Sequence, residues 1–179
     1  MKAYLKDILG MSLYLLGVLI LTYLVIQFVG QRTVVEGVSM ENTLMDGDNL
    51  IVDKITYRLH EPKRFDVIVF PYQQGKNTYY IKRVIGLPGE SVYINEVGEI
   101  FINDERLYES FGKEAMLMPG MAEDTIYLKS DEYFVLGDNR NKSADSRDPS
   151  VGVVKRENIV GRAWFRMYPF DSMGFIKHE

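Results

Sequence analysis

The stretch TYYIKRVIGLPGESVYI, residues 78–94, contains two short runs of β-branched and aromatic residues separated by the turn sequence GLPGE. Such runs predict β-strands, and glycine with proline between them predicts a tight connection. The same pattern recurs from about residue 32 onward, in DNLIVDKI, FDVIVF, EYFVLG and IVGRAWFRMYPF. No convincing amphipathic helix of a dozen residues interrupts it. We therefore expect a mainly β domain of antiparallel strands that form a folded or partly closed sheet.

A long apolar run, ILGMSLYLLGVLILTYLVIQFVGQ at 8–31, precedes this β-rich region and contains no charged residue. About 20 apolar residues suffice to cross the hydrocarbon core of a bilayer. A buried core helix would rarely stay uncharged over such a length at the N-terminus of so small a domain. A cleaved signal peptide is a second alternative, but the run is too long for one and no small-residue cleavage site follows it.

We therefore expect a single transmembrane helix at 8–31, between a cytoplasmic N-terminus at 1–7 and a β-rich extracytoplasmic domain at 32–179. The orientation follows from the positive charges, because Lys2 and Lys6 precede the run and only Arg32 follows it closely. The predicted location is the cell membrane, with a single pass.

The composition excludes several classes of function. A chain of 179 residues with a net charge of −4 and no basic stripe is not a typical nucleic-acid binder. It has no cysteine, and its two histidines, His60 and His178, do not have the spacing of metal ligands. We expect no metal, no cofactor and no nucleic-acid partner.

Ser39 follows the apolar run closely, within VVEGVSMENTL at 34–44. Ser39 lies seven residues past Arg32, so an extended chain places it only about 23 Å from that residue, near the membrane surface. A serine in such a position is usually a turn or cap residue. If it is a nucleophile, it needs a general base, and the scarcity of histidine suggests that the base is another residue.

The position of Lys82 within an apolar strand makes it the candidate for the general base. Lys82 and Arg83 interrupt an otherwise apolar strand, and alternation directs them to opposite faces. A buried lysine can lose its proton near neutral pH, whereas arginine cannot and needs a carboxylate partner. The alternative for Lys82 is an edge-strand lysine that discourages aggregation.

The loop LGDNRNKSADSRD, residues 136–148, follows the strand-like run EYFVLG. Its oxygen donors could form a solvated turn network or a calcium site. However, the ligand order of an EF-hand is missing, and its arginines and lysine oppose a divalent cation. Another interpretation is that the loop holds a Ser39–Lys82 catalytic dyad in position. In this interpretation Ser143 binds the Lys82 amine and Asp145 bridges Arg147 and Arg83.

Together these features resemble the type I signal peptidases, which are membrane-anchored Ser/Lys proteases. The resemblance covers nearly the whole chain and rests on three motifs in order: SMENTL at 39–44, KRVIGLPGE at 82–90 and GDNRNKSADSR at 137–147. The chain departs from the family pattern at Asn42, where a proline is usual, and at Glu90, where an aspartate is usual.

The resemblance implies a mainly β catalytic domain of coiled antiparallel β-sheets, which agrees with the strand pattern. It also implies a catalytic role for Ser39 as nucleophile and for Lys82 as general base and later acid. It implies that Ser143 orients Lys82 and that Asp145 forms salt bridges with Arg83 and Arg147. It also implies that the backbone N–H of Ser39 forms part of an oxyanion hole. Gly37 stands where some members supply a serine hydroxyl as a second donor.

The function implied is a serine endopeptidase that removes signal peptides from exported preproteins, cutting after small residues at the membrane lipid surface. Two alternatives remain. One is a catalytically inactive membrane-anchored β-domain that binds exported peptides. The other is a self-cleaving Ser/Lys domain of the repressor type, although a membrane span here takes the place of its DNA-binding module.

Overall fold

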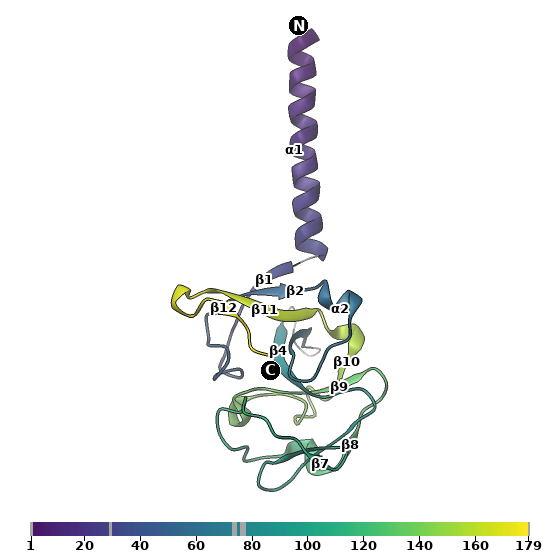
Figure 1. Ribbon diagram of the computed structural model, residues 1–179, viewed down its shortest axis with the longest axis vertical. Helices are drawn as coiled ribbons and strands as arrows, with labels where there is room; N and C mark the ends of the chain where they lie inside the picture. Colours follow the sequence, from purple (N-terminus) through teal and green to yellow (C-terminus); the bar gives the residue numbers. More distant parts are fainter. Residues whose placement is uncertain (1, 29, 73–74, 76–77, 179) are drawn as a thin grey trace.

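The N-terminal helix stands apart from the rest of the molecule (Figure 1). The computed structural model describes residues 2–28, 30–72, 75 and 78–178. The helix, α1 (Lys2–Phe28), includes a stretch from Lys6 to Leu24 that is long and apolar enough to cross a membrane and is not buried by the protein. A long apolar stretch that the protein does not bury is suited to lipid.

The predicted span at 8–31 differs from α1 at both ends. The helix already begins at Lys2, and the last residues of the apolar run, Gly30 and Gln31, belong to strand β1 (Gly30–Val34). The chain therefore passes from the helix into the first β-sheet almost without a linker.

The remainder is mainly antiparallel β-structure, as the sequence pattern predicts. The large sheet has the order β1-β2-β11-β3-β4-β9-β10, with β12 paired to β11. Its further strands are β2 (Asn49–Asp53), β3 (Val67–Pro71), β4 (Tyr79–Gly86), β9 (Glu132–Leu136), β10 (Val154–Lys155), β11 (Gly161–Tyr168) and β12 (Gly174–Phe175). The small sheet has the order β7-β6-β5-β8, with β5 (Ser91–Ile94), β6 (Ile100–Ile102), β7 (Glu105–Arg106) and β8 (Ile126–Tyr127).

The helical segments of this β-domain are short. They comprise α2 (Thr56–Leu59) and the 3-10 turns η1 (Gly120–Glu123), η2 (Arg140–Lys142), η3 (Arg156–Asn158) and η4 (Phe170–Ser172). In Figure 1, β1, β2 and β11 lie next to the end of α1, and the small sheet lies at the far end of the domain.

The stretch at 78–94 joins the two sheets, because β4 belongs to the large one and β5 to the small one. The turn between them has Gly89 in the left-handed region at φ 81°, which glycine adopts without strain. Glu90 stabilises the turn by accepting a hydrogen bond from the Leu87 N–H at 2.7 Å and pairing with Arg64 at 2.6 Å. A glutamate thus serves at the position where the family pattern has an aspartate.

Among the described residues, buried hydrophobic side chains form three clusters. One lies between the sheets and combines Ile85 and Phe134 of the large sheet with Val92 of the small one. The other two lie around β3, whose residues Val67, Val69, Ile68 and Phe70 are all nearly inaccessible to solvent. Most of β3 and the second half of β4, from Lys82 to Gly86, are therefore buried, so a polar side chain there is removed from water.

Gly86 ends β4 at the point where the two sheets come together. A Cβ there would lie 2.6 Å from Val92, 2.8 Å from Leu128 and 3.0 Å from Phe134. Only a residue without a side chain fits in this space.

Substitution Gly86→Ala should therefore lower the free energy of unfolding by about 1–3 kcal/mol, the usual cost of overpacking. Urea unfolding of the full chain in detergent, followed by fluorescence of Trp164, measures the change. Gly174→Ala is the matched control, because no atom lies within 4 Å of a Cβ at that position. Equal stability of the two variants would contradict the role given to Gly86.

Candidate active site

Ser39 lies in the turn that follows β1. Amide hydrogen bonds define the turn: Glu41 donates to the Val38 carbonyl at 3.1 Å and Leu44 to the Met40 carbonyl at 2.8 Å. Met40 and Leu44 are buried in the hydrophobic core, and their packing there holds the turn in place. Ser39, between the exposed Val38 and the buried Met40, is half-buried at the wall of a cleft.

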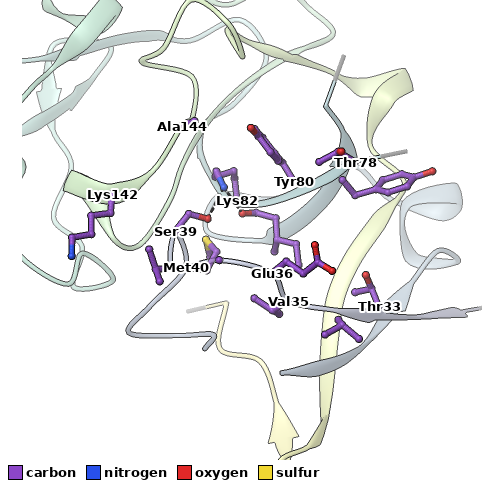
Figure 2. A pocket seen from close by; sticks show the side chains of 15 residues that line it. Thr33, Val35, Glu36, Ser39, Met40, Thr78, Tyr80, Lys82, Lys142 and Ala144 are labelled. Atoms are coloured by element: carbon purple, nitrogen blue, oxygen red, sulfur yellow. Dashed lines mark hydrogen bonds between the residues drawn. The ribbon is translucent and has the colours of Figure 1, made fainter. Parts of the chain in front are cut away.

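Lys82 reaches the same cleft from β4, where it is paired with Ile68 of β3. Its side chain is 3% exposed, and its Nζ lies within hydrogen-bond distance of the Ser39 Oγ, at 2.8 Å (Figure 2). The Nζ also donates to the Ile81 carbonyl at 3.0 Å and lies 4.9 Å from the centre of the Tyr80 ring. The fold thus brings together two residues that are far apart in the sequence.

Burial lowers the pKa of Lys82 to about 8, because the charged amine is removed from water. The negative charges of Asp145 and Asp138 act in the opposite direction and raise this pKa, but less strongly. The amine therefore loses its proton more easily than an ordinary lysine, and its neutral form can accept a proton from a hydroxyl in contact with it.

Arg83 is fully buried and points away from Lys82, as strand alternation predicts. Its partner is Asp138, with Nε 2.8 Å from Oδ1 and Nη2 2.7 Å from Oδ2. The prediction that Asp145 bridges Arg83 was therefore wrong. The reason is the register of the sheet: Arg83 pairs with Leu136 of β9, and Asp138 lies two residues beyond Leu136, diagonally across from Arg83.

Asp145 forms the other predicted pair, with Arg147, at 2.8 Å for both Nε and Nη2. Asp145 also accepts the Gly137 N–H at 3.0 Å, and Arg147 donates to the Met118 carbonyl at 3.1 Å. The pair ties the two ends of the loop 137–147 together. Asp138 and Asp145, two of the oxygen donors that the calcium alternative invoked, are thus each paired with a guanidinium group.

Ser143 does not make the hydrogen bond to Lys82 that the resemblance implied. Its Oγ is buried without a hydrogen-bond partner among the residues that the structure describes. It packs against Gly137, where a Cβ would lie 2.2 Å from the Ser143 Oγ and 2.5 Å from the Ser39 carbonyl oxygen. The glycine allows the loop to approach the backbone of Ser39 closely.

Two residues that the sequence analysis did not single out connect the loop to the serine. The Asn139 N–H donates to the Ser39 carbonyl at 3.0 Å, and Thr43 donates through Oγ1 to Asp138 at 2.5 Å. Both occur in the quoted motifs, but their partners depend on contacts over more than ninety residues. The sequence therefore shows that these two polar residues are present, but not which groups they bind.

The turn around Ser39 contains two residues in the left-handed region. Gly37 has φ 93°, and its N–H donates to Asp46 at 2.7 Å. Asn42 has φ 99°, a value that proline cannot adopt, and its amide donates to the Phe111 carbonyl at 3.0 Å. Asparagine tolerates this region better than most residues, so the departure from the family's proline fits the local backbone.

The cleft lies between two stretches of chain, 33–40 and 78–82, with Lys142 and Ala144 completing its wall (Figure 2). The first half of β4 pairs with β3 on one side, and its pairing with β9 begins only at Arg83. In the described chain, the edge of Tyr79–Lys82 that faces away from β3 is thus free of a strand partner. The same described ranges contain no group of three His, Cys, Asp or Glu side chains that could hold a metal.

Comparisons with known proteins agree with one another. The profile of the family described as "Signal peptidase, peptidase S26" matches residues 8–168, which include Ser39, Lys82 and the loop 137–147. A probable signal peptidase I-2 of Synechocystis sp. is 36% identical over 157 residues, 85% of this chain and 69% of that protein. Signal peptidase I of Leptolyngbya laminosa is 40% identical over 154 residues, 82% of this chain and 73% of that protein.

Among solved structures, a crystal structure of a signal peptidase I from Enterococcus faecalis is 31% identical. The region of similar structure covers 57% of this chain and 97% of the Enterococcus faecalis chain, with a TM-score of 0.46.

Removing the negative charge of Asp138 should leave the positive charge of Arg83 buried without an opposite charge beside it. Asp138→Asn is expected to lower the free energy of unfolding by about 3–5 kcal/mol, the usual effect of breaking a buried pair. A double-mutant cycle with Arg83→Met, measured by urea unfolding of the full chain, isolates the interaction. The matched cycle combines Arg83→Met with Asp145→Asn and should give a much smaller coupling energy; equal coupling in both cycles would contradict the assigned partner.

Proposed function

This chain belongs to the signal peptidase family, and from that premise we propose that Ser39 and Lys82 are the nucleophile and general base with which it removes signal peptides from exported preproteins. The chain is a serine endopeptidase, and the observation that supports these two roles is the 2.8 Å separation of Lys82 Nζ and Ser39 Oγ in an accessible cleft.

The reaction proceeds in two steps. Neutral Lys82 accepts the proton of the Ser39 hydroxyl as Oγ attacks the scissile carbonyl carbon, and it then gives that proton to the nitrogen of the leaving amine. This releases the mature protein and leaves the signal peptide as an ester on Ser39. In the second step, Lys82 accepts a proton from water, the water oxygen attacks the ester, and Ser39 recovers its proton.

The negative charge on the carbonyl oxygen needs a donor, and the Ser39 N–H is our candidate. It makes no hydrogen bond within the described part of the chain, so it is free to bind the oxyanion. Gly37 cannot contribute a side chain, and its N–H already donates to Asp46. The Ser39 N–H is thus the donor on which we base the oxyanion site.

The ion pairs position the dyad without touching the substrate. Arg83–Asp138 lies directly behind β4 next to Lys82, and Asp145–Arg147 fixes the loop whose Asn139 holds the Ser39 carbonyl. We assign Arg83, Asp145 and Arg147 to this supporting role, together with Asp138. Ser143 packs beside Gly137 and fills the space behind the serine.

We further propose that α1 anchors the chain in the cell membrane, with its N-terminus in the cytoplasm and the β-domain outside. The orientation follows from the lysines that precede the apolar run. Ser39 lies eleven residues beyond the end of α1, so the nucleophile works near the lipid surface. A signal peptide held in the same membrane meets it at a raised effective concentration.

The substrate binds as an extended strand in the cleft. The free edge of Tyr79–Lys82 offers backbone donors and acceptors, and the stretch 33–38 forms the facing wall. Binding of this kind depends on main-chain hydrogen bonds, while shallow apolar pockets select side chains. Small residues before the cut fit such pockets.

The dyad is tested with a preprotein substrate and the detergent-solubilised full chain. Ser39→Ala and Lys82→Ala should each reduce kcat/KM at least about 10³-fold, because each removes one half of the activated nucleophile. Lys155→Ala, an exposed lysine outside the cleft, is the control and should cut normally. The N-terminus of the product, read by mass spectrometry, should follow a small residue. Binding of the preprotein without any cleavage by the unsubstituted chain would instead indicate an inactive peptide-binding domain.

The pH dependence follows from the lowered pKa of Lys82. Below pH 8 the amine is mostly protonated and cannot accept the serine proton, so kcat/KM should rise about tenfold per pH unit there and level off above it. At pH 7 roughly a tenth of the molecules have the neutral amine. A pH series in constant ionic strength measures the profile, and a rate that is already maximal at pH 6 would exclude a lysine base.

A further inference from the structure

Lys142 is an exposed cation in the wall of the cleft, and the proposed mechanism does not use it. It lines the same cleft as Ser39 and Lys82. Figure 2 shows it on the opposite side of Ser39 from Thr33 and Glu36, which line the other end. No carboxylate of the described residues forms an ion pair with it. Its charge is therefore available to a bound peptide.

The position of Lys142 is fixed relative to the nucleophile. It is the last residue of η2, and its N–H donates to the Asn139 carbonyl at 3.0 Å, while the Asn139 N–H donates to the Ser39 carbonyl. Arg140, in the same turn, is buried and pairs with Glu109 at 2.6 Å. The backbone that bears Lys142 is thus attached to the backbone of the serine.

The direction of the substrate follows from the anchor. Thr33 belongs to β1, which follows α1 directly and lies beneath its end (Figure 1). A peptide whose apolar segment is in the membrane enters the cleft from the Thr33 end, because that end is nearest to the bilayer. The residues after the cut then leave past Ser39 on the Lys142 side.

The charges along the cleft differ between its two ends. Glu36 is exposed at the entry side. On the exit side the nearby acid Glu41 is paired with Lys113 at 2.6 Å, so it does not compensate Lys142. The cleft is therefore acidic where the signal peptide enters and basic where the mature chain leaves.

We propose that Lys142 is a specificity determinant that favours preproteins with an acidic side chain in the first residues after the cut and disfavours a basic one there. This rests on the proposed function, because it requires that Ser39 cuts the peptide in the cleft. The charge of an exposed lysine interacts with an opposite charge modestly, so the preference should be about two- to fivefold and should weaken with salt.

The test uses a set of preproteins that differ only at the first, second or third residue after the cut, with Asp, Asn or Lys at each. Aspartate and asparagine have nearly the same shape, so their ratio of kcat/KM reports charge alone. At one or more positions the full chain should prefer Asp to Asn and Asn to Lys. The ratio of kcat/KM for the Asp substrate to that for the Asn substrate should fall to about one for Lys142→Gln. It should fall below one for Lys142→Glu.

Two control variants separate this effect from general electrostatics. Lys155→Gln removes an exposed lysine outside the cleft and should keep the full preference. Glu36→Gln removes the charge at the entry end and should keep the preference for residues after the cut.

The outcomes also separate the two proposals. Cleavage that is lost in Ser39→Ala but shows no charge preference, or a preference that persists in Lys142→Gln, would overturn the role of Lys142 and leave the dyad intact. Cleavage that persists in Ser39→Ala would overturn both.

Discussion

A lysine can serve as a base near neutral pH only if its amine is kept from water, and most of this fold contributes to that condition. Strand β3 is almost entirely buried, and β4 becomes buried at Lys82, where the strand leaves the wall of the cleft. Burial lowers its pKa to about 8. The same burial would be costly for a free cation, which is why the amine rests against the Ser39 hydroxyl and the Ile81 carbonyl.

The charges around Lys82 are arranged so that they do not reverse this effect. Asp138 and Asp145 both raise the pKa of the amine, and each is paired bidentately with an arginine. Without these arginines the two carboxylates would act on Lys82 uncompensated and favour its charged form. We therefore expect the two ion pairs to stabilise the loop and, at the same time, to favour the neutral form of the Lys82 amine that the proposed reaction requires.

The fold also relates the chemistry to the membrane. The chain passes from α1 into β1 and reaches Ser39 in the next turn, so the anchor and the nucleophile belong to adjacent segments. The cleft begins at β1 and ends beyond the serine at Lys142, which gives it a direction and a difference in charge. In the proposed arrangement, a substrate that shares the membrane meets the acidic end first and the basic end last.

The sequence by itself determined the elements with local patterns: the apolar helix, the β-rich domain and the serine and lysine within their motifs. It did not determine the partners of Arg83 and Ser143, because those depend on register and packing between distant segments. Arg83 was expected to pair with Asp145, and the alignment of β4 with β9 instead places Asp138 beside it. Ser143 was expected to bind Lys82, and the close approach that Gly137 allows places its hydroxyl elsewhere. Only the tertiary structure brings Lys82 to Ser39. The burial that lets a lysine act as a base comes from the packing of strands that are distant in the sequence, and no local sequence pattern predicts that packing.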